Sequence, residues 1–200
     1  MNPAYTKSLN ELIEEFGKLP GIGPKTAERL AFYILKAQKT DAMALANAIS
    51  DVKSRIHQCR VCYNLSETEI CSICSDSRRD HGVICVVEQP KDVISLEKTG
   101  LCKWVYHVLN GHLAPLEGIE PEDLTIDALV KRIREGTVKE VVMATNPNLE
   151  GDGTSLYIHS LLHELNVKVT KLARGLPAGS AIEFASGNIL TDAIMNRTEF

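Results

Sequence analysis

The start of the chain carries apolar side chains at helical spacing, in two runs separated by a glycine-containing turn. Ser8 and Glu11 have the spacing of a helix-capping box around the start of the first run. Pro24 stands in a favoured first-turn position ahead of the second run. The apolar positions fall on one face of each predicted helix, and they are Leu9, Leu12, Ile13 and Phe16, then Ala27, Leu30, Ala31, Ile34 and Leu35. The pattern therefore predicts a helical hairpin whose turn spans residues 19–23.

From residue 82 onward the pattern alternates between short apolar runs and stretches with helical spacing. The predicted strands cover residues 82–88, 104–109, 139–146 and 167–173. The predicted helices between them cover residues 90–99, 126–133 and 156–165. Because this alternation is typical of a parallel sheet covered by helices, we expect an α/β domain. In such a sheet, functional groups gather at the carboxyl ends of the strands.

The composition is that of a globular protein, and its charge further restricts the possible functions. The 200 residues are 44% hydrophobic and 24% charged, with a formal net charge of −4 at pH 7. Residues 1–53 carry net +1 and residues 82–172 carry net −4. This balance excludes a uniformly basic nucleic-acid coat but allows a local basic patch. The chain shows no secretion signal and no apolar run long enough to span a bilayer, so we expect a cytoplasmic protein without a membrane partner.

Four of the six cysteines form two CxxC pairs separated by eight residues. These are Cys59, Cys62, Cys71 and Cys74. In a reducing compartment this spacing favours a metal over disulfides, and four thiolates complete a closed tetrahedral zinc site with no open position for catalysis. A redox CxxC motif would need a single pair on a βαβ scaffold, and His57 could replace one cysteine. The sequence therefore predicts one structural Zn²⁺.

The turn of the hairpin carries candidate DNA-binding residues. Gly21 and Gly23 allow backbone N–H groups at the start of the second helix to approach a phosphate, and Lys25 and Arg29 add positive charge. Both cations lie opposite the apolar face of that helix. Such contacts hold a protein on DNA without reading its bases. The alternative is a tight structural turn with two solvated cations, but the full string LPGIGPKTAERLAF favours phosphate binding in a helix-hairpin-helix.

Acidic residues follow two of the predicted strands. Glu88 follows the first strand, while Glu150 and Asp152 lie in a predicted loop after the third. This arrangement is similar to the Toprim domain of topoisomerases, primases and some nucleases, whose catalytic members have a T-D-P-D-R-E-G-like loop with two magnesium-binding aspartates. Here the loop reads TNPNLEG, with Asn146 and Asn148 at the aspartate positions, and an amide is a poor magnesium ligand beside a carboxylate. The resemblance implies a Toprim fold without the catalytic metal site.

A hairpin, a four-cysteine site and a Toprim-like sheet, in this order, closely resemble the RecR family of bacterial recombination proteins over essentially the whole chain. The string LARGLPAG at residues 172–179 is similar to the family's C-terminal segment, which is likened to a Walker B strand, although Ser186 replaces an aspartate frequent in the family. The resemblance implies a ring-forming tetramer that acts with RecO and RecF. It also implies that Glu88, Asp92 and Glu150 contact RecO, and we expect these carboxylates to face solvent.

Two functional hypotheses follow from these features. One is a non-enzymatic DNA-binding clamp and mediator in recombinational DNA repair. The alternative is a magnesium-dependent Toprim enzyme that cleaves or joins nucleic acid, which the two asparagines disfavour. The expected domains are a helix-hairpin-helix region at residues 1–53, a zinc finger at 54–79, a Toprim domain at 80–172 and a Walker-B-like oligomerisation segment at 173–200.

The other polar clusters are interpreted as structural. Lys131, Arg132 and Arg134 are expected to form a solvated helix face. His159 and His163 are spaced for a metal pair on one helix, but no carboxylate third ligand is evident, so a structural role is favoured.

Overall fold

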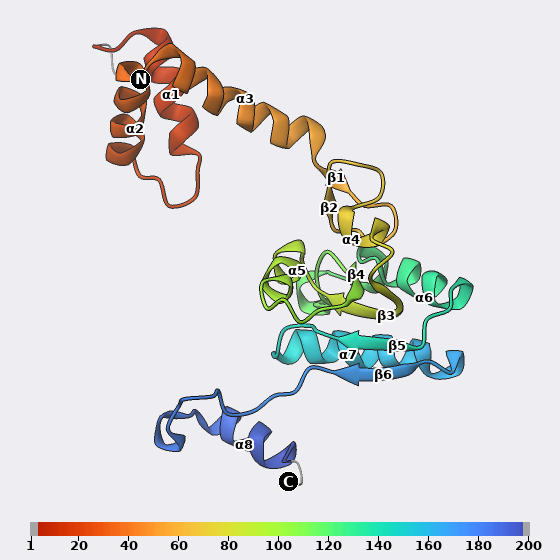
Figure 1. Ribbon diagram of the computed structural model, residues 1–200. Helices are drawn as coiled ribbons and strands as arrows, with labels where there is room; N and C mark the ends of the chain where they lie inside the picture. The colour runs from red at the N-terminus through yellow and green to blue at the C-terminus, as the bar shows by residue number, and fades with distance from the viewer. Residues whose placement is uncertain (1–3, 198–200) are drawn as a thin grey trace. The chain divides into compact units, whose positions relative to one another are not determined.

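The computed structural model describes residues 4–197, and the chain divides into two compact units, of which the first ends at Ile56 and the second begins at His57. Figure 1 follows the chain through both. Within its described residues the first unit consists of three helices, which are α1 (Lys7–Gly17), α2 (Pro24–Lys36) and α3 (Lys39–Arg55).

The helices α1 and α2 form the predicted hairpin. They pack against each other, and Ala27 and Ala31 on the inner face of α2 are buried. Small side chains at this contact let the two helices approach closely. The first helix begins at Lys7 with Thr6 as its N-cap residue. The predicted capping box at Ser8 is therefore wrong, because Ser8 already lies inside the first helical turn.

The third helix, α3, is not indicated by the apolar pattern. Its sequence, KTDAMALANAISDVKSR, is rich in alanine, which has the highest intrinsic helix propensity. Every residue of α3 remains at least partly exposed. The exposed apolar side chains of this helix are Met43, Leu45, Ile49 and Val52. Backbone propensity, rather than burial of one face within the unit, explains why this segment is helical.

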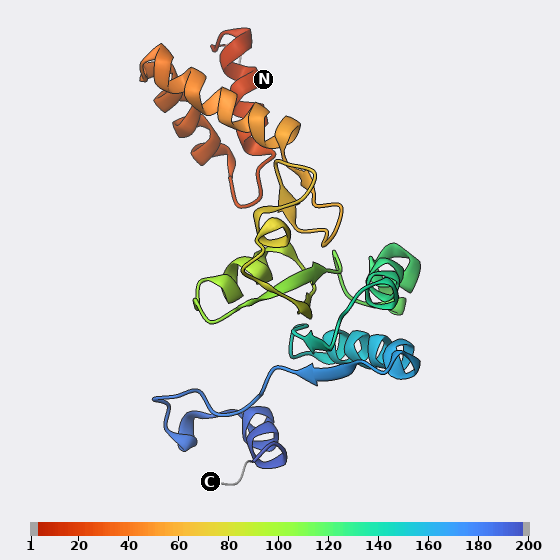
Figure 2. The same cartoon turned by 45° about the vertical axis from the view of Figure 1, so that its right-hand side comes forward.

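The second unit begins with the cysteine-containing segment and continues into a parallel sheet. The short strands β1 (His57–Gln58) and β2 (Leu65–Ser66) pair antiparallel, and α4 (Ser72–Ser75) follows them. The sheet has the strand order β4-β3-β5-β6, and all neighbouring pairs are parallel. Figure 1 labels these strands, and Figure 2 gives a second view of the chain, turned by 45° about the vertical axis. Its strands are β3 (Asp80–Val87), β4 (Trp104–Val108), β5 (Glu140–Met143) and β6 (Lys168–Lys171). The α/β fold class with a parallel sheet is confirmed.

Helices cover both faces of this sheet, and the alternation along β3 shows how. The covering helices are α5 (Pro90–Glu97), α6 (Ile126–Glu135) and α7 (Leu149–Leu162). Ile84 and Val86 point into a core shared with α6 and α7, whereas Cys85 and Val87 point into a second core with α5. Four 3₁₀ turns are described besides these helices, namely η1 (Pro115–Glu117), η2 (Pro121–Asp123), η3 (His163–Leu165) and η4 (Ile182–Phe184).

The start of α7 differs from the sequence-based expectation. The helix begins at Leu149 rather than near residue 156, so Glu150 and Asp152 lie in its first turn and not in a loop. The glycines of this stretch mask the helical pattern, but close packing explains Gly151, where a Cβ atom would lie 2.1 Å from the Asn146 carbonyl oxygen. The sequence pattern detects only the more apolar end of the helix.

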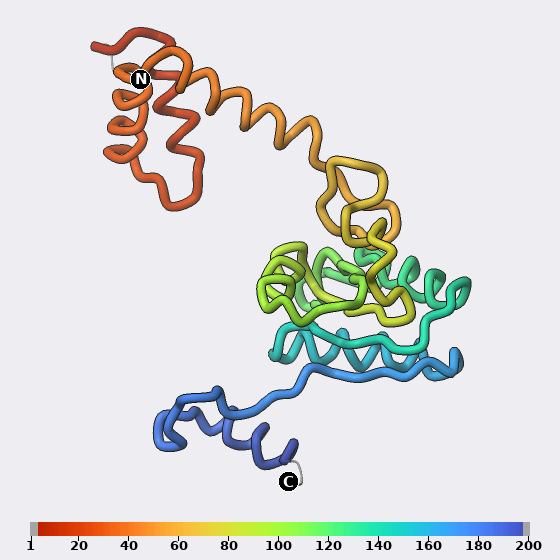
Figure 3. Tube along the Cα trace, in the orientation of Figure 1, coloured from red at the N-terminus to blue at the C-terminus, as the bar shows by residue number. Residues whose placement is uncertain are grey.

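The chain ends in a segment that leaves the sheet after β6 and finishes in α8 (Gly187–Met195), as Figure 3 traces. Ser186 is the N-cap residue of α8, and its hydroxyl accepts a hydrogen bond from the Ile189 N–H at 3.4 Å. Serine and aspartate are both favoured at this position, so Ser186 fills the same structural role as an aspartate there. Within residues 4–197, no helix is both long and apolar enough to cross a membrane.

Candidate functional site

The four clustered cysteines point their sulfur atoms at one another. The sulfurs all lie within 4.8 Å of each other, and those of Cys62 and Cys71 are 3.6 Å apart. A zinc ion with Zn–S bonds of about 2.3 Å separates its tetrahedral sulfur ligands by about 3.8 Å. All four are free thiols, and Cys59, Cys62 and Cys71 are buried. The donor set and its spacing fit a structural zinc ion, as the sequence predicts.

Backbone hydrogen bonds shape this segment before any ion is added. The Cys59 N–H donates to the Asn64 carbonyl at 2.7 Å, which closes the first CxxC turn. The Cys71 N–H donates to the Cys59 sulfur at 3.3 Å, a contact that stabilises negative charge on sulfur. Hydrogen bonding from the Cys62 thiol lowers the pKa of Cys71, and the same contact raises the pKa of Cys62. Without an ion the contacts therefore favour thiolate at Cys71 and thiol at Cys62, whereas a metal would bind both as thiolates.

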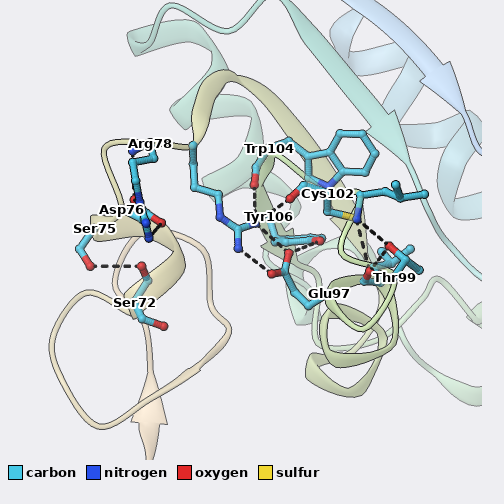
Figure 4. A network of polar contacts seen from close by, with 12 residues as sticks. Ser72, Ser75, Asp76, Arg78, Glu97, Thr99, Cys102, Trp104 and Tyr106 are labelled. Atoms are coloured by element: carbon cyan, nitrogen blue, oxygen red, sulfur yellow. Dashed lines mark hydrogen bonds and ion pairs between the residues drawn. The ribbon is translucent and has the colours of Figure 1, made fainter.

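The zinc segment, which comprises residues 57–79, is fixed to the edge of the sheet. The Val108 N–H in β4, an edge strand, donates to the Cys62 carbonyl at 2.8 Å. At the end of the same segment, Arg79 forms a two-pronged ion pair with Glu97, with N–O distances of 2.8 and 2.6 Å. Glu97 also accepts a hydrogen bond from the Tyr106 hydroxyl at 2.7 Å (Figure 4). The zinc segment, α5 and β4 are thus held together by polar contacts.

The acidic end of the sheet is arranged differently from what the sequence suggests. Glu88 is only 2% exposed, so the expectation that it faces solvent is wrong. Its carboxylate accepts hydrogen bonds from the Asn146 backbone N–H at 2.7 Å and from the Asn146 side-chain amide at 2.6 Å. It also contacts His112 Nδ1 at 3.2 Å. Burial is tolerated here because the chain itself supplies hydrogen-bond donors to the charge.

The remaining carboxylates of this region have local partners. Asp92 accepts a hydrogen bond from the Gln89 N–H at 2.8 Å and caps α5, and it is half-buried. Asp152 is paired with Lys171 and, at 2.5 Å, with Arg174. The guanidinium of Arg174 lowers the pKa of Asp152 to about 2. Glu150 is half-buried in the first turn of α7.

The two asparagines of the TNPNLEG loop both have structural partners. Asn146 donates to Glu88, and the side chain of Asn148 accepts from the Gly151 N–H at 2.9 Å as the N-cap of α7. Aspartate could replace Asn148 as a cap, but it could not donate the Asn146 hydrogen bond. Among residues 4–197, the four cysteines are the only group of three or more His, Cys, Asp or Glu arranged to hold a metal.

The hairpin turn of the first unit places the predicted cations at one helix end. Gly21 has a φ of +79°, a left-handed conformation that favours glycine, whereas Gly23 is extended and precedes α2 directly. Lys25 and Arg29 are both exposed, one helical turn apart. Pro24 has no N–H, and the two N–H groups after Lys25 both donate to the Gly23 carbonyl, so the Gly23 and Lys25 N–H groups are the donors left at this end of α2. Backbone donors and cations are the kinds of group that bind phosphate.

The structure also shows polar partners for residues that the sequence pattern places in solvent or does not single out. Arg132 is half-buried and donates from Nη1 to the Tyr106 carbonyl at 2.7 Å, so the solvated-face interpretation is wrong for this residue. Arg79 and His112 are missed because their partners are distant in sequence. His159 and His163 are both exposed, and α7 ends between them at Leu162.

Three family models match successive parts of the chain. They describe a RecR helix-hairpin-helix over residues 9–53, a RecR zinc finger domain with four cysteines over residues 56–76, and a Toprim domain over residues 82–173. The fold and its sites therefore define a protein that joins a helical hairpin, a structural zinc finger and a Toprim domain.

Full-length relatives show which family combines these parts. The Recombination protein RecR of Rhodopirellula baltica is 52% identical over 193 residues, covering 96% of this chain and 97% of the relative. That of Desulforudis audaxviator is 52% identical over 195 residues, covering 98% of both chains. That of Dehalococcoides mccartyi is 44% identical over 198 residues, covering 99% and 97% respectively. The chain belongs to the RecR family of recombination proteins.

Proposed function

We propose that this chain is a non-enzymatic DNA-binding clamp and mediator in recombinational DNA repair, acting in the cytoplasm with RecO-like and RecF-like proteins. Membership of the RecR family supports the role in recombination. The hydrogen bond from the Asn146 amide to Glu88 is the observation that supports a non-enzymatic function. In this arrangement a side-chain amide of the protein stabilises the carboxylate that a magnesium-dependent enzyme would keep beside its metal.

DNA binding is assigned to the turn and first helical turns of α2, at Gly21, Gly23, Lys25 and Arg29. Contacts to phosphate through backbone N–H groups and two cations carry no base information, so binding is independent of sequence. Residues 1–53 have a net charge of only +1, which makes a single hairpin a weak binder. Several hairpins on one DNA molecule raise the effective affinity, and we infer a homo-oligomer, in particular a tetramer, whose assembly is coupled to DNA binding.

Salt-dependent DNA binding tests the hairpin directly. The double variant Lys25→Ala/Arg29→Ala removes two phosphate contacts, so the logarithmic salt slope on duplex DNA should fall by about 1.8. The measurement is fluorescence anisotropy on duplexes of unrelated sequence, with light scattering to report assembly. Lys36→Ala/Lys53→Ala is the matched control, since it removes two exposed cations of α2 and α3. Equal slopes for the wild type and the hairpin variant would leave the hairpin a purely structural element.

Partner binding is assigned to the acidic end of the sheet, through Glu88, Asp92 and Glu150. Because Glu88 is buried, its role in partner binding is indirect and consists of holding the Asn146 loop in place. Asp92 and Glu150 are only half-buried, so a partner can contact them directly. A basic partner surface would pair with these charges and steer association. Glu150→Lys should weaken binding of a RecO-like protein and leave DNA affinity unchanged. Glu122→Lys, an exposed charge reversal in η2, should leave both affinities unchanged.

The magnesium-dependent enzyme is the outcome that would overturn this proposal. Incubation of the protein with supercoiled DNA and Mg²⁺ should leave the DNA intact. Nicking that depends on Mg²⁺ and disappears in Glu88→Ala would show phosphodiester chemistry at the acidic end. Nicking that persists in Glu88→Ala would come from a contaminating nuclease and leave the proposal standing.

A further inference from the structure

A concave surface lies between the zinc segment and helix α6, outside the sites described above. Its volume is about 430 Å³, within the size range of pockets that hold small ligands. Arg60 and Tyr63 line it from the zinc segment, and Lys131 and Arg132 line it from α6. We call this surface the α6 groove. It brings three cations and one aromatic ring together from two elements far apart in the sequence.

The net charge of the α6 groove is positive. Glu135 is its acidic member, and it faces three cations. Arg60 is paired with Glu69 at 2.6 Å, but both side chains are 68% exposed. Exposed pairs of this kind contribute little free energy, so Arg60 can exchange its partner for an anionic ligand. Lys131 is exposed. The groove therefore suits an anion that extends over several positions.

Two contacts fix the walls of the groove relative to each other. The Val108 N–H to Cys62 carbonyl bond holds the zinc segment on β4 directly before Tyr63. Arg132 is held from α6 by its bond to the Tyr106 carbonyl in the same strand. A guanidinium has five N–H donors, so this single bond positions Arg132 and leaves donors for a ligand. The cations are thus organised before a ligand arrives, which lowers the entropic cost of binding.

The aromatic member is also held in place. Tyr63 has a φ of +61°, which is uncommon for a residue other than glycine. Its ring contacts the buried His107 ring at a centroid distance of 5.4 Å, and the residue remains half-exposed. Cations beside a half-exposed ring are the combination that single-stranded nucleic acid requires, because the backbone meets the charges while a base stacks on the ring.

We propose that the α6 groove binds single-stranded DNA, with Arg60, Lys131 and Arg132 on the phosphates and Tyr63 beside a base. The inference rests on the proposed function, because it gives a DNA-binding protein a second contact on its other unit. A concave groove admits a flexible single strand, whereas the convex, paired backbone of a duplex would reach only the cations at its rim. The groove therefore separates single-strand from duplex binding within one chain.

The test removes two cations of the α6 groove from protein that already lacks Lys25 and Arg29 of the hairpin. In Lys25→Ala/Arg29→Ala protein, the further change Arg60→Gln/Lys131→Gln should lower the salt slope on oligo-dT by about 1.4, which corresponds to roughly 25-fold weaker binding at 0.1 M salt. Arg132 is left in place because its bond to Tyr106 supports the fold. Lys91→Gln/Lys98→Gln, on and just after α5, is the matched control and should leave the slope unchanged. Zinc content reports whether each variant is folded.

A second measurement depends on no variant. Oligo-dT with 5-bromodeoxyuridine, irradiated on wild-type protein, should cross-link to the peptide that contains Tyr63. Loss of affinity in the groove variant but not in the α5 control, together with this cross-link, supports the groove. Unchanged oligo-dT binding, an equal loss on duplex, or cross-links confined to residues 21–29 would overturn it. Failure of wild-type protein to bind any DNA would instead overturn the proposed function.

Discussion

The zinc segment and the acidic end of the sheet both collect metal-ligating residue types, yet the structure organises them in opposite ways. The four cysteine sulfurs lie within 4.8 Å and face one another. The carboxylate of Glu88 instead faces amide donors of Asn146. A cluster of ligand-type residues therefore needs a metal where the chain supplies too few donors for the negative charge, and the Cys71 N–H bond to the Cys59 sulfur does not offset four neighbouring thiolates.

The difference follows from the cost of burying charge. Several thiolates at van der Waals distance repel one another strongly, and a divalent cation is the compensation that lets them coexist. A single carboxylate is stabilised by two or three N–H hydrogen bonds without any ion. Asn146 supplies two such bonds, and His112 Nδ1 lies at hydrogen-bonding distance from the same carboxylate. Metal removal should therefore destabilise the zinc segment but not the acidic end of the sheet, whereas loss of the Asn146 amide should destabilise the acidic end.

The largest effect is expected at the zinc segment. Cys71→Ser should remove the bound zinc and unfold residues 57–79 locally, because structural zinc contributes on the order of 10 kcal/mol to such segments. The Val108 N–H should then exchange faster with solvent, since its acceptor is the Cys62 carbonyl. Elemental analysis and hydrogen exchange measure the two effects. Cys102→Ser is the control and should keep the zinc, and protein purified without chelators that contains no zinc would contradict the site.

The next largest effect is expected when the Asn146 amide is replaced by a carboxylate. Asn146→Asp places a second carboxylate oxygen where the amide nitrogen now lies 2.6 Å from Glu88. The repulsion should lower the free energy of unfolding by about 2–4 kcal/mol at neutral pH. Millimolar Mg²⁺, or a pH low enough for the pair to share a proton, should restore stability. Thermal unfolding in EDTA and in Mg²⁺ measures this.

The control for this exchange lies two residues along the loop. Asn148→Asp keeps an N-cap oxygen for the Gly151 N–H, so its stability should stay within about 0.5 kcal/mol of wild type. If Asn146→Asp is as stable as Asn148→Asp in EDTA, then the amide does not stabilise Glu88. The acidic end would in that case resemble the zinc segment more than the structure indicates.

How far the sequence predicts each region follows from the same physics. The zinc ligands are local, since a CxxC pair presents both thiols from one turn, and spacing alone therefore locates them. The hairpin and the parallel sheet are predicted for a similar reason. Apolar spacing of 3.6 residues in a helix and alternating burial in a strand are both patterns among neighbouring residues. The family resemblance extends these local signals to the whole chain.

The sequence fails where the partner is distant. Glu88 and Asn146 are separated by 58 positions, so no local pattern reveals that one satisfies the other. Arg132 in α6 is misread as solvated because its acceptor, the Tyr106 carbonyl, lies in β4, 26 positions away. The start of α7 is missed because glycine has low helix propensity, and Gly151 is there for close packing, which no local pattern reveals. Burial of a polar group is a tertiary property.

A smaller effect is expected for the ion pair between the zinc segment and α5. Glu97→Ala should cost about 2–3 kcal/mol, because Arg79 is only 17% exposed and would lose its carboxylate partner. Glu69→Ala breaks a pair with Arg60 whose side chains are both 68% exposed, and it should cost less than about 0.5 kcal/mol. Denaturant unfolding of the two variants measures the contrast. Equal costs would show that the Arg79 pair does not join the zinc segment to α5.

The smallest effect concerns Asp152, which holds the start of the C-terminal segment through Arg174. Its folded pKa of about 2 lies below the ordinary 3.8, so the charged form is favoured by folding. The contribution is therefore fully present above pH 3.8 and is lost as the pH falls through about 2. Because the side chain is 36% exposed, solvent screening keeps it below about 1 kcal/mol.

Asp152→Asn should accordingly be slightly less stable than wild type at neutral pH, with the difference vanishing between pH 3.8 and about 2. Trypsin should also cleave after Arg174 faster in this variant, because the guanidinium is no longer held against α7. Glu183→Gln, an exposed change in the same segment, should leave the cleavage rate unchanged. A stability difference that grows as the pH is lowered would show that folding disfavours the charged form of Asp152, and the ion pair with Arg174 would then not anchor the segment.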